Sequence, residues 1–191
     1  MQSTFKISVS KLSPAFIKDM QEKYGEAELE ITINRNPDFK PLTENEFWDI
    51  ISLLDWEREE DTDIIQPAIN KLCALPIAHI YGFEDILAQK LYELDQKKFA
   101  KNTGENAYQK GKYFSVDVFL YARACVVANG QEAYEEVVKN PTLMPKGMTF
   151  EPLLSLASKA YEIKTGKGFS YIPSYIYETY SNKEGWSETN T

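Results

Sequence analysis

The chain has 191 residues, 43% of them hydrophobic and 26% charged, which suits one domain or a domain with a small appendage. Its formal net charge of −8 argues against general affinity for nucleic acid or an anionic membrane, because both need concentrated lysine and arginine. There is no apolar signal core and no window near the length of a membrane span. Cys73 and Cys125 lie in apolar segments, are expected to stay reduced, and favour the cytoplasm.

Residues 1–36 predict a small β-α-β appendage. STFKISVS and ELEITIN, residues 3–10 and 28–34, alternate apolar and polar side chains with the period of half-buried strands. Between them, Ser13-Pro14 starts a helix and Gly25 stops it. Two strands form a marginal sheet alone, so this unit is expected to pack on the rest or to form a homodimer through a strand edge.

A mainly helical domain is predicted over residues 42–191, which makes the expected fold class α+β. Thr43 and Glu46 have the spacing of a capping box ahead of the first helix. The clearest amphipathic helix follows a break at Gly82 and carries Lys90 on its apolar face, where the long side chain is expected to reach water.

The segment FSVDVFLYARACVVANG, residues 114–130, predicts a buried helix between Ser115 and the Asn129-Gly130 pair. The aromatic tail GFSYIPSYIYETYSNKEGW, residues 168–186, is expected to drape over the helical core. Its tyrosines and tryptophan suit a protein interface and equally suit the covering of irregular loops.

Patterns that mark catalysis, metals or phosphate are weak. His79, the only histidine, sits among apolar residues without a nucleophile signature, which favours a structural histidine. The acidic run at residues 55–63 lacks the glycine of a calcium loop, and KTGKG at residues 164–168 follows a helix, whereas a phosphate loop precedes one. No catalytic residue, metal site or cofactor is predicted.

Arg123 is the strongest candidate for a binding residue, because it lies near the middle of an apolar helix. Asp117, six residues earlier, falls in the first turn, where the helix dipole favours a carboxylate, and about 120° away around the axis. An unpaired buried guanidinium costs several kcal/mol, so a counter-charge is expected from another helix or from a ligand. The candidate binding set comprises Arg123, Asp117, Tyr121, Glu84, Asp85 and Asp95, with Glu93 as a further source of the counter-charge.

Three blocks of sequence, FWDII, the run from LYELDQKKFAKNTGENAYQKGKYF through SVDVFLYARACVVANGQEAYEEVVKNP, and LLSLASKAYEIKTGKGF, resemble a bacterial family known as domain of unknown function 4240. The resemblance spans residues 43–186 and implies a mainly helical domain without an established activity. The family's commoner form has two acids after the serine and a tryptophan after the arginine, whereas this chain has only Asp117 and then Ala124.

Acidity, aromatic content and the lack of a catalytic pattern favour a non-enzymatic protein-interaction module with an unidentified protein partner. An immunity-type protein that blocks a toxin is one concrete version. The alternatives are a small-ligand-binding domain with a pocket around Arg123 and an enzyme of unrecognised type that uses His79 or a pair of carboxylates.

Overall fold

The computed structural model describes residues 13–25 and 40–187, and the chain divides into two compact units, residues 1–39 and 40–191. In the first unit, helix α1 (Pro14–Tyr24) begins and ends where the sequence predicts. The Ser13 hydroxyl accepts a hydrogen bond from the Phe16 N–H at 3.2 Å, and Gly25 closes the last turn with a positive φ of 58°.

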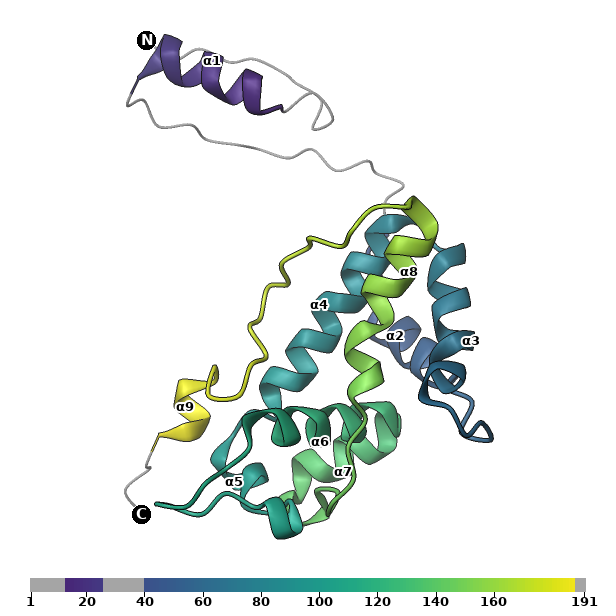
Figure 1. Ribbon diagram of the computed structural model, residues 1–191, viewed down its shortest axis with the longest axis vertical. Coiled ribbons are helices and arrows are strands. Elements are labelled where there is room, and N and C mark those ends of the chain that lie inside the picture. The colour runs from purple at the N-terminus through teal and green to yellow at the C-terminus, as the bar shows by residue number, and fades with distance from the viewer. Residues whose placement is uncertain (1–12, 26–39, 188–191) are drawn as a thin grey trace. The chain divides into compact units, whose positions relative to one another are not determined.

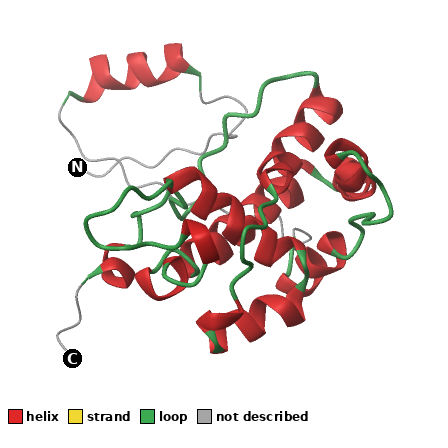
Figure 2. Cartoon of the chain, turned by 60° about the horizontal axis from the view of Figure 1, so that its bottom comes forward, coloured by secondary structure: helices red, strands yellow, loops and turns green. Residues whose placement is uncertain are grey.

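The predicted α+β class is wrong. The described residues form helices joined by loops and contain no strand (Figure 2), so the fold is helical and the β-α-β appendage is not found. Its central helix, α1, is found, whereas the two proposed strands and their dimerisation edge lie outside the described residues. Alternation over seven or eight residues is a local signal that identifies no pairing partner, so it could not by itself carry a fold class.

The second unit is built from helices whose starts are encoded locally. The Thr43 hydroxyl accepts from the Glu46 N–H while the Glu46 carboxylate accepts from the Thr43 N–H, which confirms the predicted capping box. The helices are α2 (Glu44–Ile51), α3 (Asp61–Ala74), α4 (Ile77–Glu93), α5 (Lys97–Ala100), α6 (Val116–Ala128), α7 (Gln131–Lys139), α8 (Leu156–Thr165) and α9 (Lys183–Trp186), with 3-10 turns η2 (Gly104–Asn106), η3 (Pro141–Leu143) and η4 (Glu151–Ser155).

One hydrophobic core joins these helices. Helix α8 packs on α3 and α4, and α6 packs on α4, α7 and η4 (Figure 1). Helix α6 is apolar around most of its circumference and nearly all of its residues after the first turn are buried, as its sequence predicts. Its N-cap is Ser115, whose hydroxyl accepts from the Val118 N–H at 3.3 Å.

Helix α4 starts five residues earlier than predicted, because Gly82 lies inside it. A Cβ at this position would be 3.0 Å from the Cβ of Leu42, the residue that leads the chain into α2. Gly82 therefore marks a close approach of two segments, and the predicted break there is wrong.

After α8 the chain leaves the helical pattern. Gly166 caps the helix in the left-handed region with a φ of 68°. Residues 167–182, here called the strap, then run without helix or strand along α4 as far as α9 (Figure 1). This confirms that the aromatic tail covers the helical core. None of the helices in the described ranges has the length and apolar character needed to cross a membrane.

Candidate functional site

Four of the six predicted site residues lie along the underside of the strap, at different points of its length. Glu84 and Asp85 lie on α4, Asp95 follows the end of α4, and Arg123 lies on α6. Each of them makes at least one hydrogen bond to a strap residue or to its helical end. From the sequence, the three acids were expected to supply the counter-charge for Arg123. In the structure, all four residues form hydrogen bonds that hold the strap and its helical end.

Asp85 holds the first half of the strap. One carboxylate oxygen accepts from the backbone N–H of Ser174 at 2.8 Å and from its hydroxyl at 3.1 Å. The other accepts from the phenol of Tyr171 at 2.6 Å. Burial and then Asp85 raise the pKa of Tyr171 to about 12, so the phenol remains a donor at physiological pH.

Arg123 holds the middle of the strap and is completely buried. Its Nη1 donates to the carbonyls of Leu91 at 2.8 Å and Tyr177 at 3.0 Å, and its Nη2 donates to the Thr179 hydroxyl at 3.0 Å. The guanidinium carbon also lies 4.8 Å from the centre of the Phe119 ring, an arrangement that stabilises a cation.

No carboxylate lies within ion-pair distance of Arg123 in the described part of the chain. Burial lowers its pKa to about 10, and the more distant charges of Asp95 and Glu178 oppose that shift. The group therefore stays charged at neutral pH, and its charge is solvated by carbonyl and hydroxyl oxygens. The Nε atom is buried without a hydrogen-bond partner.

Asp95 holds the end of the strap and is also completely buried. It accepts from the backbone N–H of Tyr180 at 3.2 Å and of Asn182 at 3.0 Å, and from the indole N–H of Trp186 at 2.8 Å. Asn182 in turn donates to the Tyr92 carbonyl and caps α9 by accepting from the Gly185 N–H. A carboxylate with three N–H donors is well compensated for its burial.

Gly185 fits closely against this anchor, which gives a direct test of the docking. A Cβ there would lie 2.3 Å from Cγ and 2.9 Å from Cβ of Gln96, and 3.2 Å from the Asp95 carbonyl oxygen. We expect Gly185→Ala to displace α9 and to lower the melting temperature by several degrees, at a cost of about 2 kcal/mol. Gly168→Ala is the matched control, because nothing lies within 4 Å of its added Cβ. Equal melting temperatures for the two variants would contradict the close fit.

Glu84 faces the strap from α4. It is buried, and the Tyr177 phenol lies 3.5 Å from one of its oxygens, a long hydrogen bond. Burial raises the pKa of Glu84 to about 7 despite this hydrogen bond, and the neighbouring charge of Asp85 adds to the shift. Glu84 therefore titrates near neutral pH in the folded protein.

The other two predicted residues lie outside this arrangement. Asp117 is exposed in the first turn of α6, in agreement with its expected place at the helix start. Tyr121 is partly buried on α6, and partial burial followed by Glu151 raises the pKa of its phenol, with smaller contributions from Asp117 and Glu178. Neither residue contacts Arg123 through a hydrogen bond.

A shallow surface depression of about 530 Å³ adjoins the strap. It is lined by Tyr92 of α4, by Lys183 of α9 and by residues of the strap, namely Ser174, Tyr175, Ile176, Thr179, Tyr180 and Ser181. Within the described ranges, no three histidine, cysteine or acidic side chains are grouped to hold a metal ion. His79 lies partly buried in the first turn of α4 and does not line the depression.

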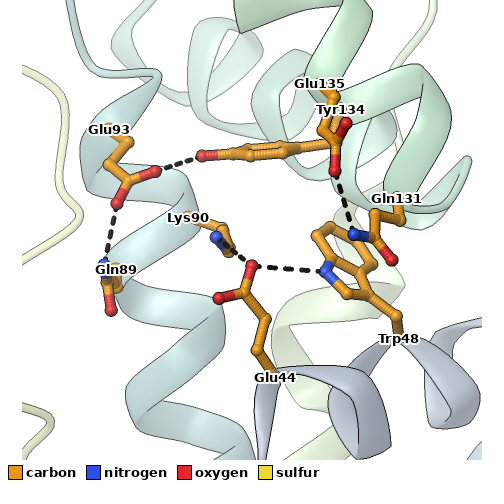
Figure 3. Close-up of polar contacts among 8 residues, drawn as sticks. All are labelled: Glu44, Trp48, Gln89, Lys90, Glu93, Gln131, Tyr134 and Glu135. Atoms are coloured by element: carbon orange, nitrogen blue, oxygen red, sulfur yellow. Dashed lines mark hydrogen bonds and ion pairs between the residues drawn. The ribbon is translucent and has the colours of Figure 1, made fainter.

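A second polar cluster was missed from the sequence. Lys90 is buried, its ammonium is 2.6 Å from the Glu44 carboxylate, and it faces the rings of Tyr134 and Trp48 at 5.0 and 6.0 Å (Figure 3). The expectation that Lys90 reaches water is therefore wrong. Its hydrogen bond lowers the pKa of Glu44, whereas burial and then Glu93, which accepts from the Tyr134 phenol, raise the pKa of Tyr134.

The Lys90 cluster ties α2, α4 and α7 together, because Glu44 and Trp48 lie on α2, Lys90 and Glu93 on α4, and Tyr134 on α7 (Figure 3). Lysine and tyrosine on separate helices have no sequence spacing that would signal their contact. The only local signal was a lysine in the apolar stripe of α4. We assign this cluster a packing role, since its cation is already paired and enclosed by aromatic rings.

The fold and the site together define a helical domain whose buried charges secure a C-terminal strap. A sequence model of the family described as protein of unknown function (DUF4240) matches residues 42–163, more than half of the chain, and the protein belongs to this family. The match begins as expected and ends within α8, so the strap lies beyond it. No curated protein and no solved structure matches the chain.

Proposed function

We propose that this protein is a non-enzymatic protein-binding module that uses the outer face of its strap as the contact surface. The observation that carries the proposal is the combination of buried polar anchors with apolar side chains that face outward. Ile172 and Ile176 are 84% and 67% exposed, and Tyr175 and Tyr180 are exposed beside them on the strap. These four side chains lie within nine residues of a segment that has no regular secondary structure.

Single exposed apolar side chains are common on protein surfaces, but a cluster of them on an ordered segment is typical of a surface that binds another protein. Tyrosine adds a large contact area at low entropic cost, and the anchors below the strap reduce the entropy that binding must overcome. The expected partner is a protein with an apolar patch, able to bury both isoleucines and to fill the adjoining depression.

The geometry favours this function over a small-ligand site at Arg123. The terminal nitrogens of that guanidinium already donate to three protein oxygens, and its side chain has no exposed surface. A ligand would have to displace the strap before it met the charge.

The proposal is tested by affinity capture from a lysate of the native cells, with mass spectrometry of both proteins and small molecules. The bait is compared with Ile172→Ser/Ile176→Ser, which removes apolar contact area from the strap, and with Val138→Ser/Leu143→Ser, which removes exposed apolar area from α7 and η3. We expect one protein to be retained by the wild type and the control and to be lost from the strap variant.

Both double variants should melt close to the wild type, since exposed positions contribute little to stability. A partner that binds the strap variant as well as the wild type would rule out the strap as its contact surface. Recovery of a metabolite and no protein would overturn the proposed function.

A further inference from the structure

Trp56, an exposed aromatic residue outside the strap, lies in the loop between α2 and α3. Its indole is 50% exposed, and its inner side packs on the buried ring of Phe150 with centroids 4.9 Å apart. Phe150 is itself fixed by a hydrogen bond from its N–H to the Tyr121 carbonyl at 3.0 Å. The large side chain is therefore held in place while half of its surface remains in water.

The loop that carries Trp56 is ordered by its own backbone. The N–H of Asp55 donates to the Ile64 carbonyl at 3.0 Å, and the Asp55 carboxylate accepts from the N–H of Glu57 and from Nε of Arg58. The indole N–H of Trp56 donates to no group in the parts of the chain that the structure describes. This geometry presents an aromatic face and a free donor together.

The loop that carries Trp56 and the first turn of α3 are rich in acids. Within residues 55–63, Asp55 forms an ion pair with Arg58, whose pKa is raised by the hydrogen bond to Asp55 and also slightly by the charge of Asp63. The other acids are exposed and form no ion pair with a described residue: Glu57, Glu59, Glu60, Asp61 and Asp63. Two further apolar side chains are exposed on the segments that carry Trp56 and Phe150, namely Leu53 and Met148.

We propose that this surface, called here the Trp56 surface, binds an arginine-bearing segment of another protein. A guanidinium is planar and weakly hydrated, so it stacks on an indole face while its N–H groups donate to carboxylates at the edge. An ammonium gains less from the same ring, because it remains strongly hydrated. The arrangement therefore selects arginine over lysine.

Charge excludes the main competing occupants. Nucleic acid and anionic lipid are repelled by five unpaired carboxylates, and a second copy of this surface is repelled for the same reason. A basic protein segment is attracted, and its association should be steered at low ionic strength. The surface does not include the strap, so this inference stands or falls independently of the proposed function.

The test measures binding of the full chain to a fluorescent peptide of four Arg-Ala repeats, and to a comparison peptide of four Lys-Ala repeats. Fluorescence anisotropy gives the affinity of each peptide at 20 and 150 mM salt. We expect the arginine peptide to bind several-fold more tightly than the lysine peptide. Trp56→Ala should lower the affinity for the arginine peptide about fivefold and remove the preference for arginine over lysine. Added salt should lower the affinity for both peptides.

A matched pair of charge variants separates the Trp56 surface from overall acidity. Glu59→Gln/Glu60→Gln removes two charges from the loop, and Glu132→Gln/Glu136→Gln removes two exposed charges from α7. We expect only the loop variant to weaken binding severalfold. Equal losses in the two variants, equal affinity for the two peptides, unchanged binding by Trp56→Ala, or no binding at 20 mM salt would each overturn the proposal.

Discussion

Arg123→Met is expected to lower the free energy of unfolding by about 4 kcal/mol and the melting temperature by about 10 °C. Methionine roughly fills the volume but donates no hydrogen bond. The Leu91 and Tyr177 carbonyls then lose a donor in a buried site, and Thr179 loses one of its two partners. The cost exceeds that of an ordinary surface change because unsatisfied groups remain inside the protein.

The same variant should loosen the strap before it unfolds the core. Hydrogen exchange at the Tyr180 and Asn182 amides, which donate to Asp95, reports this loosening directly, and we expect their protection to fall. Arg58→Met is the matched control, since that arginine is largely exposed and forms a surface ion pair with Asp55, and its melting temperature should stay close to that of the wild type. A small stability loss for Arg123→Met, similar to that of the control, would contradict the structural role assigned to the guanidinium.

The importance of Arg123 was predictable from the sequence, but its partners were not. A lone arginine in an apolar helix must be compensated, which directs attention to it. Its acceptors include the carbonyls of Leu91 and Tyr177, 32 and 54 residues away. Every residue carries a carbonyl, so no residue type or spacing marks the ones that are used.

The acids on α4 and just after its end were predicted to bind the wrong partner. Asp85 and Asp95 were proposed as counter-charges for Arg123, because charge pairing is the compensation that sequence makes visible. In the structure both accept from backbone N–H groups of the strap and its helical end, at Ser174, Tyr180 and Asn182. Backbone donors are as invisible in sequence as backbone acceptors, so the residues were identified and their partners missed.

The helical elements followed more directly from the sequence. Caps at Ser13, Thr43 and Ser115 were each predicted from one polar side chain and are confirmed by their hydrogen bonds. The predicted α+β class was wrong because every described element is helical, and alternation says nothing about what a strand would pair with. The helix break predicted at Gly82 was wrong for a similar reason. A glycine is found there because Leu42 of another segment approaches closely, and the local sequence does not show that contact. Interactions between residues that are close in the chain can be predicted from a short stretch of sequence, whereas contacts between distant segments cannot.

The anchors below the strap are unequal in their response to pH. Arg123 keeps its charge at neutral pH, whereas the pKa of Glu84 is raised to about 7. Glu84 faces the Tyr177 phenol. Ionisation of Glu84 therefore places a negative charge among the buried side chains under the middle of the strap. Opening of the strap would return Glu84 toward its ordinary pKa of 4.5, so the strap is expected to be held less firmly as the pH rises from 4.5 to 7 and to change little above that.

Glu84→Gln is expected to stabilise the protein at high pH and to leave it nearly unchanged at low pH. In the unfolded chain this carboxyl ionises near its ordinary pKa of 4.5, but in the folded protein burial raises the pKa to about 7. Below pH 4.5 both states hold the proton and glutamine mimics it. Between pH 4.5 and 7 the unfolded chain has released this proton while the folded protein keeps it, so the wild type loses stability progressively, and the variant's advantage grows to about 3 kcal/mol and levels off above pH 7.

Urea unfolding at pH 5, 6, 7 and 8 measures this difference, with Glu132→Gln as the control that removes an exposed carboxylate from α7. The control difference should stay within about 0.5 kcal/mol across the series. The Glu84→Gln advantage should increase with pH, because only the wild type must carry a buried charge under the strap. An advantage that is constant with pH, or that shrinks as the pH rises, would show that Glu84 is ionised in the folded protein throughout this range.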